Sequence, residues 1–445
     1  MTGKSIAKQL ILFVIPIWLG TFFQQLYNTM DAIFVGNFVG KTALAAVGGP
    51  SAQIVSLLIN VFVELAAGSS VVIAQYFGAN SGKEVGKAIH TAMSIAIIGG
   101  VLLTAAGLIF SPALLRGMKA EGEIYSLSVR FLSIYFCGTI FVTVYNLGSA
   151  VLRALGDSKH PFYFLVCGCI TNIALDFVLI YWVRMGVAGA AVATVISQAL
   201  TAGLVVRELC RLPDEYKLHF KRISIYPRIL RSMLQIGIPE SMQSILYSVS
   251  NILIQGNIDG FGTDTIAAMS AYSKVDMFFW MTMDAFGIAI TTMSGQFYGA
   301  GKIKGVKMSV KSGLLICGGV AVVLSAALLL GGRALFGLFT TDVNVIAIGL
   351  QIQHLLVPFY FIFFFVVVLT GALRGMGYSF VPMLITLVGI CLLRVVWLYV
   401  VVPLNPVLAT TLISYPVTWV LTAMVFILYY RRTIKAESRL ERIET

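Results

Sequence analysis

Apolar runs of about 20 residues, each enough for a helix to cross the hydrocarbon core of a bilayer, recur along the whole 445-residue chain. Only 11% of the residues are charged and 58% are hydrophobic, whereas soluble domains are typically about 25% charged. The chain is therefore predicted to be an all-α polytopic membrane protein. We place its twelve transmembrane spans at residues 9–35, 44–74, 88–112, 124–152, 161–183, 187–206, 232–258, 265–298, 312–332, 345–373, 378–402 and 406–430.

The formal net charge of +12 could indicate nucleic-acid binding, but its distribution favours another explanation. Most Lys and Arg residues fall at the two ends of the chain and on alternate connections between the predicted spans. Such an excess marks cytoplasmic loops. We therefore expect a multi-pass protein of the cell membrane with both termini in the cytoplasm. Its surroundings are the lipid bilayer, and no nucleic acid is expected as a partner.

The chain repeats itself with an offset of 221 residues. QYFGA at 75–79 returns as QFYGA at 296–300, and LRALGDS at 152–158 returns as LRGMGYS at 373–379. Hydropathy repeats with these motifs, six spans per half, so we expect two pseudo-symmetric six-helix lobes around a central cavity. The predicted divisions are an N-terminal lobe (1–206), a basic cytoplasmic linker (207–231), a C-terminal lobe (232–430) and a cytoplasmic tail (431–445).

Acidic side chains inside the predicted spans need an explanation, because each costs roughly 2.5–3.5 kcal/mol on insertion scales. In TNIALDFVLI (171–180), Asn172 and Asp176 lie one helical turn apart and share a face. At the repeat offset they correspond to Leu393 and Trp397, so this pair belongs to the first half alone. An ion site confined to one lobe explains the asymmetry better than a structural need shared by both. The in-span acids are Asp31, Glu64, Asp176, Glu240, Asp276 and Asp284.

Two charged residues in the second half are expected to be structural. Glu240 follows Pro239, where a helix N-terminus would stabilise a carboxylate. Arg394 is expected to be a buried counter-charge for an acid that the sequence does not identify. The six cysteines form no CxxC motif and the four histidines are scattered, so no metal site and no cofactor are expected.

The chain resembles the MATE (multidrug and toxic compound extrusion) family across essentially its full length. The resemblance implies two six-helix lobes. It also implies a transporter, with no enzymatic activity, that exports cationic amphipathic drugs or other toxic organic compounds, driven by inward flow of H⁺ or Na⁺. We expect it to act as a monomer. The motifs that carry the resemblance are NTMDAIFVG at 28–36, the paired QYFGA and QFYGA, LRALGDSKHP at 152–161, TNIALDFVLI at 171–180, GVAGAAVATVISQ at 186–198 and LRGMGYS at 373–379.

In MATE proteins a cation site in the first lobe joins an aspartate of helix 1, an asparagine and an aspartate one turn apart on helix 5, and a threonine on helix 6. The matching positions here are Asp31, Asn172, Asp176 and Thr194. Buried neighbouring carboxylates can take up a proton, and the same oxygen ligands suit a hard cation such as Na⁺, so both ions stay open.

Other polar residues are candidates for binding the substrate or the coupling ion. Some family members carry further acids on helices 7 and 10, but span 10 has no acid here, which puts a second-lobe site in doubt. Asp276 and Asp284 could supply part of that function. The additional candidates are Gln24, Asn28, Glu64, Asp276 and Asp284.

Two other functions remain open. A flippase for lipid-linked saccharides would share the broad architecture but is expected to line its cavity with basic residues, whereas the in-span charges here are mostly acidic. An intramembrane aspartyl protease would also contain paired aspartates. Its GxGD signature is absent, and Asp284 lies in DAFG instead.

Overall fold

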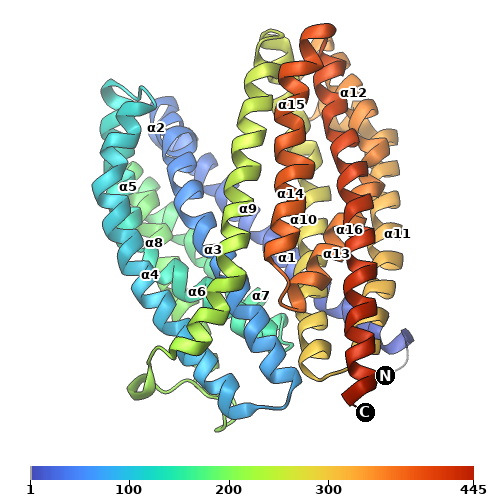
Figure 1. Ribbon diagram of the computed structural model, residues 1–445. Helices are drawn as coiled ribbons and strands as arrows, with labels where there is room; N and C mark the ends of the chain where they lie inside the picture. Colours follow the sequence, from blue (N-terminus) through green and yellow to red (C-terminus); the bar gives the residue numbers. More distant parts are fainter. Residues whose placement is uncertain (1–2, 445) are drawn as a thin grey trace. The chain divides into compact units, whose positions relative to one another are not determined.

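The computed structural model describes residues 3–444, nearly all of which are helical (Figure 1). The first half contains α1 (Gly3–Phe34), η1 (Val35–Val39), α2 (Lys41–Ala46), η2 (Val47–Ser51), α3 (Ala52–Gly78), α4 (Gly82–Gly117), α5 (Gly122–Cys137), α6 (Thr139–Ala154), α7 (Lys159–Asp176), η3 (Phe177–Trp182) and α8 (Val187–Leu209). A short η4 (Phe220–Arg222) follows. The second half contains α9 (Pro227–Asp259), α10 (Thr263–Gly299), α11 (Ile303–Gly337), α12 (Val343–Leu356), η5 (Val357–Phe359), α13 (Tyr360–Gly375), α14 (Phe380–Thr386), η6 (Leu387–Leu392), α15 (Leu393–Val400), η7 (Val402–Leu404) and α16 (Leu408–Glu444).

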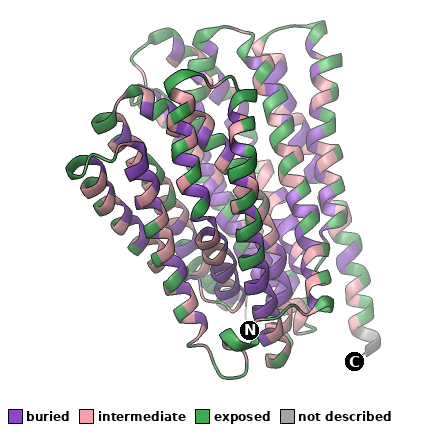
Figure 2. Ribbon diagram, turned by 90° about the vertical axis from the view of Figure 1, so that its left-hand side faces the viewer, coloured by how far each residue is buried: buried purple, intermediate pink, exposed green. Residues whose placement is uncertain are grey.

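The predicted all-α membrane architecture is confirmed. Within residues 3–444, nine helices are long and apolar enough to cross a membrane, and the bent pair of α5 and α6 makes a tenth. The two remaining predicted spans coincide with α9 and α10, which are 33 and 37 residues long but carry more polar side chains. Large apolar side chains such as Leu102 (61% exposed) and Leu330 (90% exposed) lie on the surface, which suits contact with lipid (Figure 2).

Several spans are broken rather than continuous. The fourth bends by 50° where α5 meets α6 at Gly138. A side chain there would place its Cβ 2.5 Å from Val195 Cγ2, so close helix packing explains the glycine. The tenth changes to a 3₁₀ turn at Val357–Phe359, where Pro358 removes a backbone donor. Hydropathy does not report such breaks.

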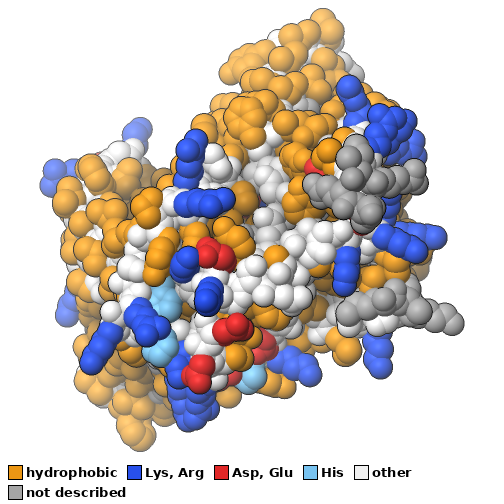
Figure 3. Space-filling model, turned by 60° about the horizontal axis from the view of Figure 1, so that its bottom comes forward, with side chains coloured by type: hydrophobic (Ala, Val, Ile, Leu, Met, Phe, Trp, Pro, Cys, Tyr) orange, Lys and Arg blue, Asp and Glu red, His pale blue; other side chains and the backbone are white. Residues whose placement is uncertain are grey.

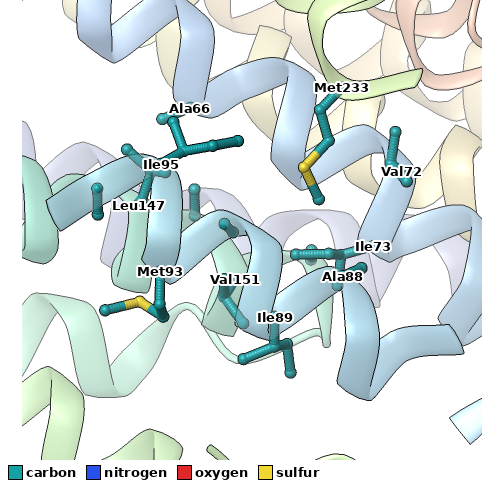
Figure 4. Close-up of a cluster of buried hydrophobic side chains, with 14 of the residues drawn as sticks. Ala66, Val72, Ile73, Ala88, Ile89, Met93, Ile95, Leu147, Val151 and Met233 are labelled. Atoms are coloured by element: carbon teal, nitrogen blue, oxygen red, sulfur yellow. The ribbon is translucent and has the colours of Figure 1, made fainter. Parts of the chain in front are cut away.

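By its internal contacts the chain divides into two compact units. One holds residues 15–241, and the other holds residues 242–444 together with residues 3–14. Figure 4 shows part of the core of the first unit, where Ile73, Ile89 and Val151 come from α3, α4 and α6. Met233 of α9 joins them, because the first turns of α9 pack within this unit.

The connection between the halves is shorter than predicted and is folded against the first unit. α8 ends at Leu209 and α9 begins at Pro227, so only residues 210–226 form the linker. The His219 backbone N–H donates to His90 Nε2 at 3.1 Å, and Leu218 is buried. Figure 3 views the end of the molecule at which this linker lies, where Lys, Arg and His side chains are exposed.

The C-terminal segment is also folded against its own unit. α16 continues without a break to Glu444. The Tyr378 hydroxyl donates to Glu437 Oε1 at 2.5 Å, and the Ile303 backbone N–H donates to Glu441 Oε1 at 3.2 Å. The predicted tail is therefore a helical extension that contacts two loops of the second half.

The expectation that a helix N-terminus stabilises Glu240 is wrong. α9 begins at Pro227 and runs through Pro239, so Glu240 lies deep inside the helix, where it is 3% exposed. Proline is tolerated there as a helix-interior residue, and it does not start a new helix as the sequence suggested.

Candidate functional site

Asp31 and Asp176 both lie where an α-helix passes into a π-helical segment. Asp31 is in the last turn of α1, just before η1, and Asp176 is the last residue of α7, directly before η3. The segments η1 and η3 pack against each other, and both pack on α8. Extra π-helical residues change the direction in which side chains point and are frequent at functional sites. Here the mutual packing of η1, η3 and α8 lies directly after the two aspartates in the sequence.

The structure brings together the four residues that match the family cation site. Asn172 and Asp176 are completely buried and Thr194 is 3% exposed. Thr194 Oγ1 lies 3.4 Å from Asp31 Oδ2, and the side chains of Asn172 and Asp176 adjoin Asp31. The first unit therefore contains two neighbouring carboxylates, an amide and a hydroxyl at one position.

Most polar atoms of this cluster have no hydrogen-bond partner within the described part of the chain. They are both side-chain polar atoms of Asn172, both carboxylate oxygens of Asp176 and Oδ1 of Asp31. The three ion pairs among the described residues lie elsewhere, so no Lys or Arg neutralises the two aspartates. Buried polar groups without partners are costly. An ion that binds these oxygens, either H⁺ or Na⁺, would remove that cost.

Other side chains around the cluster were not predicted as site residues. The Tyr27 hydroxyl lies near Asp31, Thr194 and Ser197, and Tyr135 of α5 is a further aromatic neighbour of Asp31. Tyr27 is four residues before Asp31, and Ser197 is three after Thr194, so helical spacing could have identified both. Nothing in the sequence distinguishes Tyr135 from the other aromatic residues.

The remaining predicted candidates differ in their surroundings. Gln24 and Asn28 of α1 are exposed, and Glu64 of α3 is half-buried. In the second half, Asp284 is exposed on α10, whereas Asp276 on the same helix is 8% exposed. These candidates therefore differ in exposure, and they are divided between the two units.

Asp276 lies in a packed cluster of aromatic rings within the second unit. Its Oδ2 accepts a hydrogen bond from Trp280 Nε1 at 2.6 Å, and its Oδ1 is buried without a partner. The Tyr360 ring stacks on Phe279 with centroids 4.3 Å apart, and the Trp419 ring lies 6.1 Å from that of Trp280. These rings pack against one another, so Asp276 lies in a largely apolar environment in which its polar neighbours are Trp280 Nε1 and the Tyr360 hydroxyl.

The expectation that Arg394 balances a buried acid is wrong. Its side chain is completely buried, yet its hydrogen bonds within the described residues go to Thr418 and Asn251, which are both neutral. Its guanidinium also lies over the ring of Tyr415. Neither hydropathy nor the positions of the acidic residues could identify this environment, because the groups around Arg394 are uncharged oxygens and aromatic rings.

Comparisons with known proteins agree with the resemblance seen in the motifs. The MatE family model matches residues 16–178 and 239–400, which is once in each half. The probable multidrug resistance protein YpnP of Bacillus subtilis is 28% identical over 88% of each chain. The probable multidrug resistance protein NorM of Thermotoga maritima is 26% identical over 89% of this chain and 86% of its own. A crystal structure of MATE in the bent conformation covers 99% of both chains with a TM-score of 0.91 at 22% identity, and thus shows the same fold.

Proposed function

Because the chain belongs to the MatE family of transporters, we propose that it is a secondary active antiporter that exports cationic amphipathic compounds. Inward flow of H⁺ or Na⁺ through the first-half cluster drives the export. The protein resides in the cell membrane with both termini in the cytoplasm, an orientation supported by the Lys and Arg distribution. Relatives named as multidrug resistance proteins support drugs and other toxic organic compounds as the substrate class.

One observation carries the coupling proposal: the unpartnered oxygens of Asp31 and Asp176 lie in one buried cluster with Asn172 and Thr194. Two carboxylates without a nearby cation attract a positive ion. A proton or Na⁺ that enters from outside lowers the charge of the pair from −2 to −1, which reduces the repulsion between the two carboxylates and lets α1, α7 and α8 pack together. Release of that ion to the cytoplasm restores the charged cluster.

Coupling also requires that the ion and the substrate favour different conformations of the transporter. In the proposed cycle, ion binding stabilises an arrangement of the first half that binds the substrate weakly, so the substrate leaves to the outside. A cationic substrate suits a protein whose in-span charges are mostly acidic. Export of a pyrophosphate-linked saccharide, the alternative, would need a cluster of buried basic residues. Arg394 is completely buried but stands alone with neutral partners.

A transport assay in proteoliposomes distinguishes the two candidate coupling ions and tests the site in the same experiment. Purified protein is reconstituted, and uptake or export of a fluorescent cation is driven by a proton gradient alone and then by a sodium gradient alone. We expect one of these gradients to drive transport, and Asp176→Asn to abolish it while the protein stays folded. Normal gradient-driven transport by Asp176→Asn would refute the proposed site.

A matched control removes one carboxylate elsewhere. Asp264 lies exposed in the first turn of α10, outside the cluster. Asp264→Asn makes the same chemical change and is expected to leave gradient-driven transport unchanged. A lipid-linked saccharide flippase would instead fail to export the fluorescent cation under either gradient.

A further inference from the structure

Three helices of the first half converge on two aspartates, whereas the three equivalent helices of the second half converge on one arginine. At the 221-residue offset, α7 corresponds to α14–α15 and α8 corresponds to α16. Arg394 matches Ile173, which lies between Asn172 and Asp176, and Tyr415 matches Thr194. The segment equivalent to α7, the helix that carries Asn172 and Asp176, therefore carries an arginine at the position of Ile173.

The guanidinium of Arg394 contacts the two helices that accompany α15. Its Nη1 donates to Asn251 Oδ1 of α9 at 3.3 Å, and its Nε donates to Thr418 Oγ1 of α16 at 3.2 Å. The guanidinium carbon lies 4.2 Å from the ring centroid of Tyr415 and 5.5 Å from that of Tyr247. The equivalent helices of the first half meet through Asp31, Asn172, Asp176 and Thr194.

These partners are the kind that surround a bound cation. An amide oxygen and a hydroxyl oxygen are ligands for a hard positive ion, and aromatic faces attract a cation through their quadrupole. Within the described residues no carboxylate forms an ion pair with Arg394. Its charge is held by neutral oxygens and ring faces alone, in a side chain with no exposed surface.

Filling space does not by itself account for the charge of Arg394. An apolar side chain of similar length would fill the same space without the cost of burying a guanidinium. Aliphatic replacement would, however, leave Asn251 and Tyr415 without the cation that joins α9 to α16. The arginine is the side chain whose head group can contact all three helices at once.

We propose that Arg394 is a resident cation of the second half, which holds α9, α15 and α16 together permanently as the coupling ion holds α1, α7 and α8 reversibly. This inference rests on the proposed function of the first-half cluster. It explains why the acidic cluster is present in one half only: the second half already contains its positive charge. Only the first half then rearranges when the coupling ion binds.

Hydrogen exchange on the reconstituted protein tests this difference between the halves. Peptides from α1, α7 and α8 are expected to change protection between buffers with and without the coupling ion. Peptides from α15, from α16 and from α9 beyond residue 242 are expected to keep their protection. An equal response of both halves to the ion would overturn the proposal, and this measurement needs no variant.

Chemical rescue of an Arg394 variant distinguishes the effect of the arginine's charge from the effect of its packing. Arg394→Ala is expected to raise exchange in the α15 and α16 peptides by about tenfold, as expected for loss of a desolvated cation–π contact. Added guanidinium at millimolar concentration should restore protection, whereas urea, its neutral isostere, at the same concentration should not. Equal rescue by both compounds would show that Arg394 only fills space.

Two further variants keep the test decisive if Arg394→Ala does not fold. Arg394→Lys retains the charge and is expected to keep protection close to that of the unchanged protein, whereas Arg394→Met retains the length and should lose it. Arg394→Met with unchanged protection would refute the proposal. Normal coupled transport by Asp176→Asn would instead refute the first-half site and leave these exchange results intact.

Discussion

Thr194 Oγ1 lies 3.4 Å from Asp31 Oδ2 and 2.9 Å from the carbonyl oxygen of Ala190 in its own helix. The hydroxyl has a single proton, and the shorter contact with Ala190 uses it. An ionised Asp31 would therefore face the Thr194 oxygen with no hydrogen between them. A protonated Asp31 can donate to that oxygen, and a sodium ion can bind both, so either of the proposed coupling ions would complete this contact.

Thr194→Val should weaken ion binding without changing the shape of the site. We expect the ion concentration for half-maximal transport to rise about tenfold, because the ion-bound form loses the contact between the Thr194 oxygen and the bound proton or sodium ion. Thr194→Ser restores the hydroxyl and should stay close to the unchanged protein. Initial export rates across a series of ion concentrations measure the effect, and identical curves for the Val variant would contradict it.

Asp276→Asn should preserve stability, whereas Asp276→Leu should lower it. The amide retains an oxygen that can accept from Trp280 Nε1, but leucine leaves that buried donor without a partner. The loss is expected to be about 1–3 kcal/mol. Thermal unfolding in detergent, followed by Trp fluorescence, compares the variants. If Asp276→Asn were as destabilised as Asp276→Leu, the carboxylate would do more than accept this bond.

Gly68→Ala should destabilise the first unit. A Cβ at Gly68 would lie 2.5 Å from the Met233 carbonyl oxygen and 2.9 Å from Gly237 Cα, and neither backbone atom can move alone. Overpacking of this kind costs about 1–3 kcal/mol. Gly203, on α8, has open space around its Cβ position and is the matched control.

Gly203→Ala should be stabilising by about 0.5–1 kcal/mol, because alanine loses less backbone entropy in a helix. Melting temperatures of the two variants are therefore expected to move in opposite directions. A fall of equal size in both would mean that helix propensity or lipid packing, and not the contact between α3 and α9, controls the response at Gly68.

The linker should dock less firmly as the pH falls. Partial burial, followed by the nearby cations Arg222 and Lys217, lowers the pKa of His219 below its usual range. The undocked linker then binds more protons than the docked one. The docked linker has its full stability above a pH of about 6.5, the ordinary pKa of histidine, and it loses stability as the pH falls below that value.

Limited trypsin digestion at Lys217, Lys221 and Arg222 measures this docking, with an unstructured peptide substrate correcting for trypsin activity at each pH. Cleavage is expected to speed up in mildly acidic buffer. His219→Gln keeps the backbone donor to His90 but removes the titrating ring, so its cleavage should vary less with pH. An unchanged pH response in that variant would assign the effect to another group.

Hydropathy and charge were enough to predict the helices, because crossing a bilayer demands long apolar segments whatever their packing. Helical spacing alone placed Asn172 beside Asp176. The approach of Asp31 and Thr194 to that pair came from the family motifs, since it depends on how α1, α7 and α8 pack. Hydropathy does not encode the π-helical segments η1 and η3 that follow the two aspartates.

The two wrong expectations arise in different ways. A charged residue near a proline suggested a helix start at Glu240, but α9 accommodates Pro239 within its length. A buried arginine suggested an acidic partner, but Asn251, Thr418 and Tyr415 hold Arg394 without one. The local sequence shows which buried charges need polar partners. Those partners, as for Arg394, come from helices that are distant in the chain.

The segment after α8 contacts α4 through His219, and the end of α16 contacts Tyr378 through Glu437. The two compact units nevertheless do not coincide with the two halves of the sequence. The first turns of α9 pack within the first unit, and residues 3–14 belong to the second. A chain cut within residues 210–226 would therefore not yield two self-contained halves, because each fragment would lack a segment that the other carries.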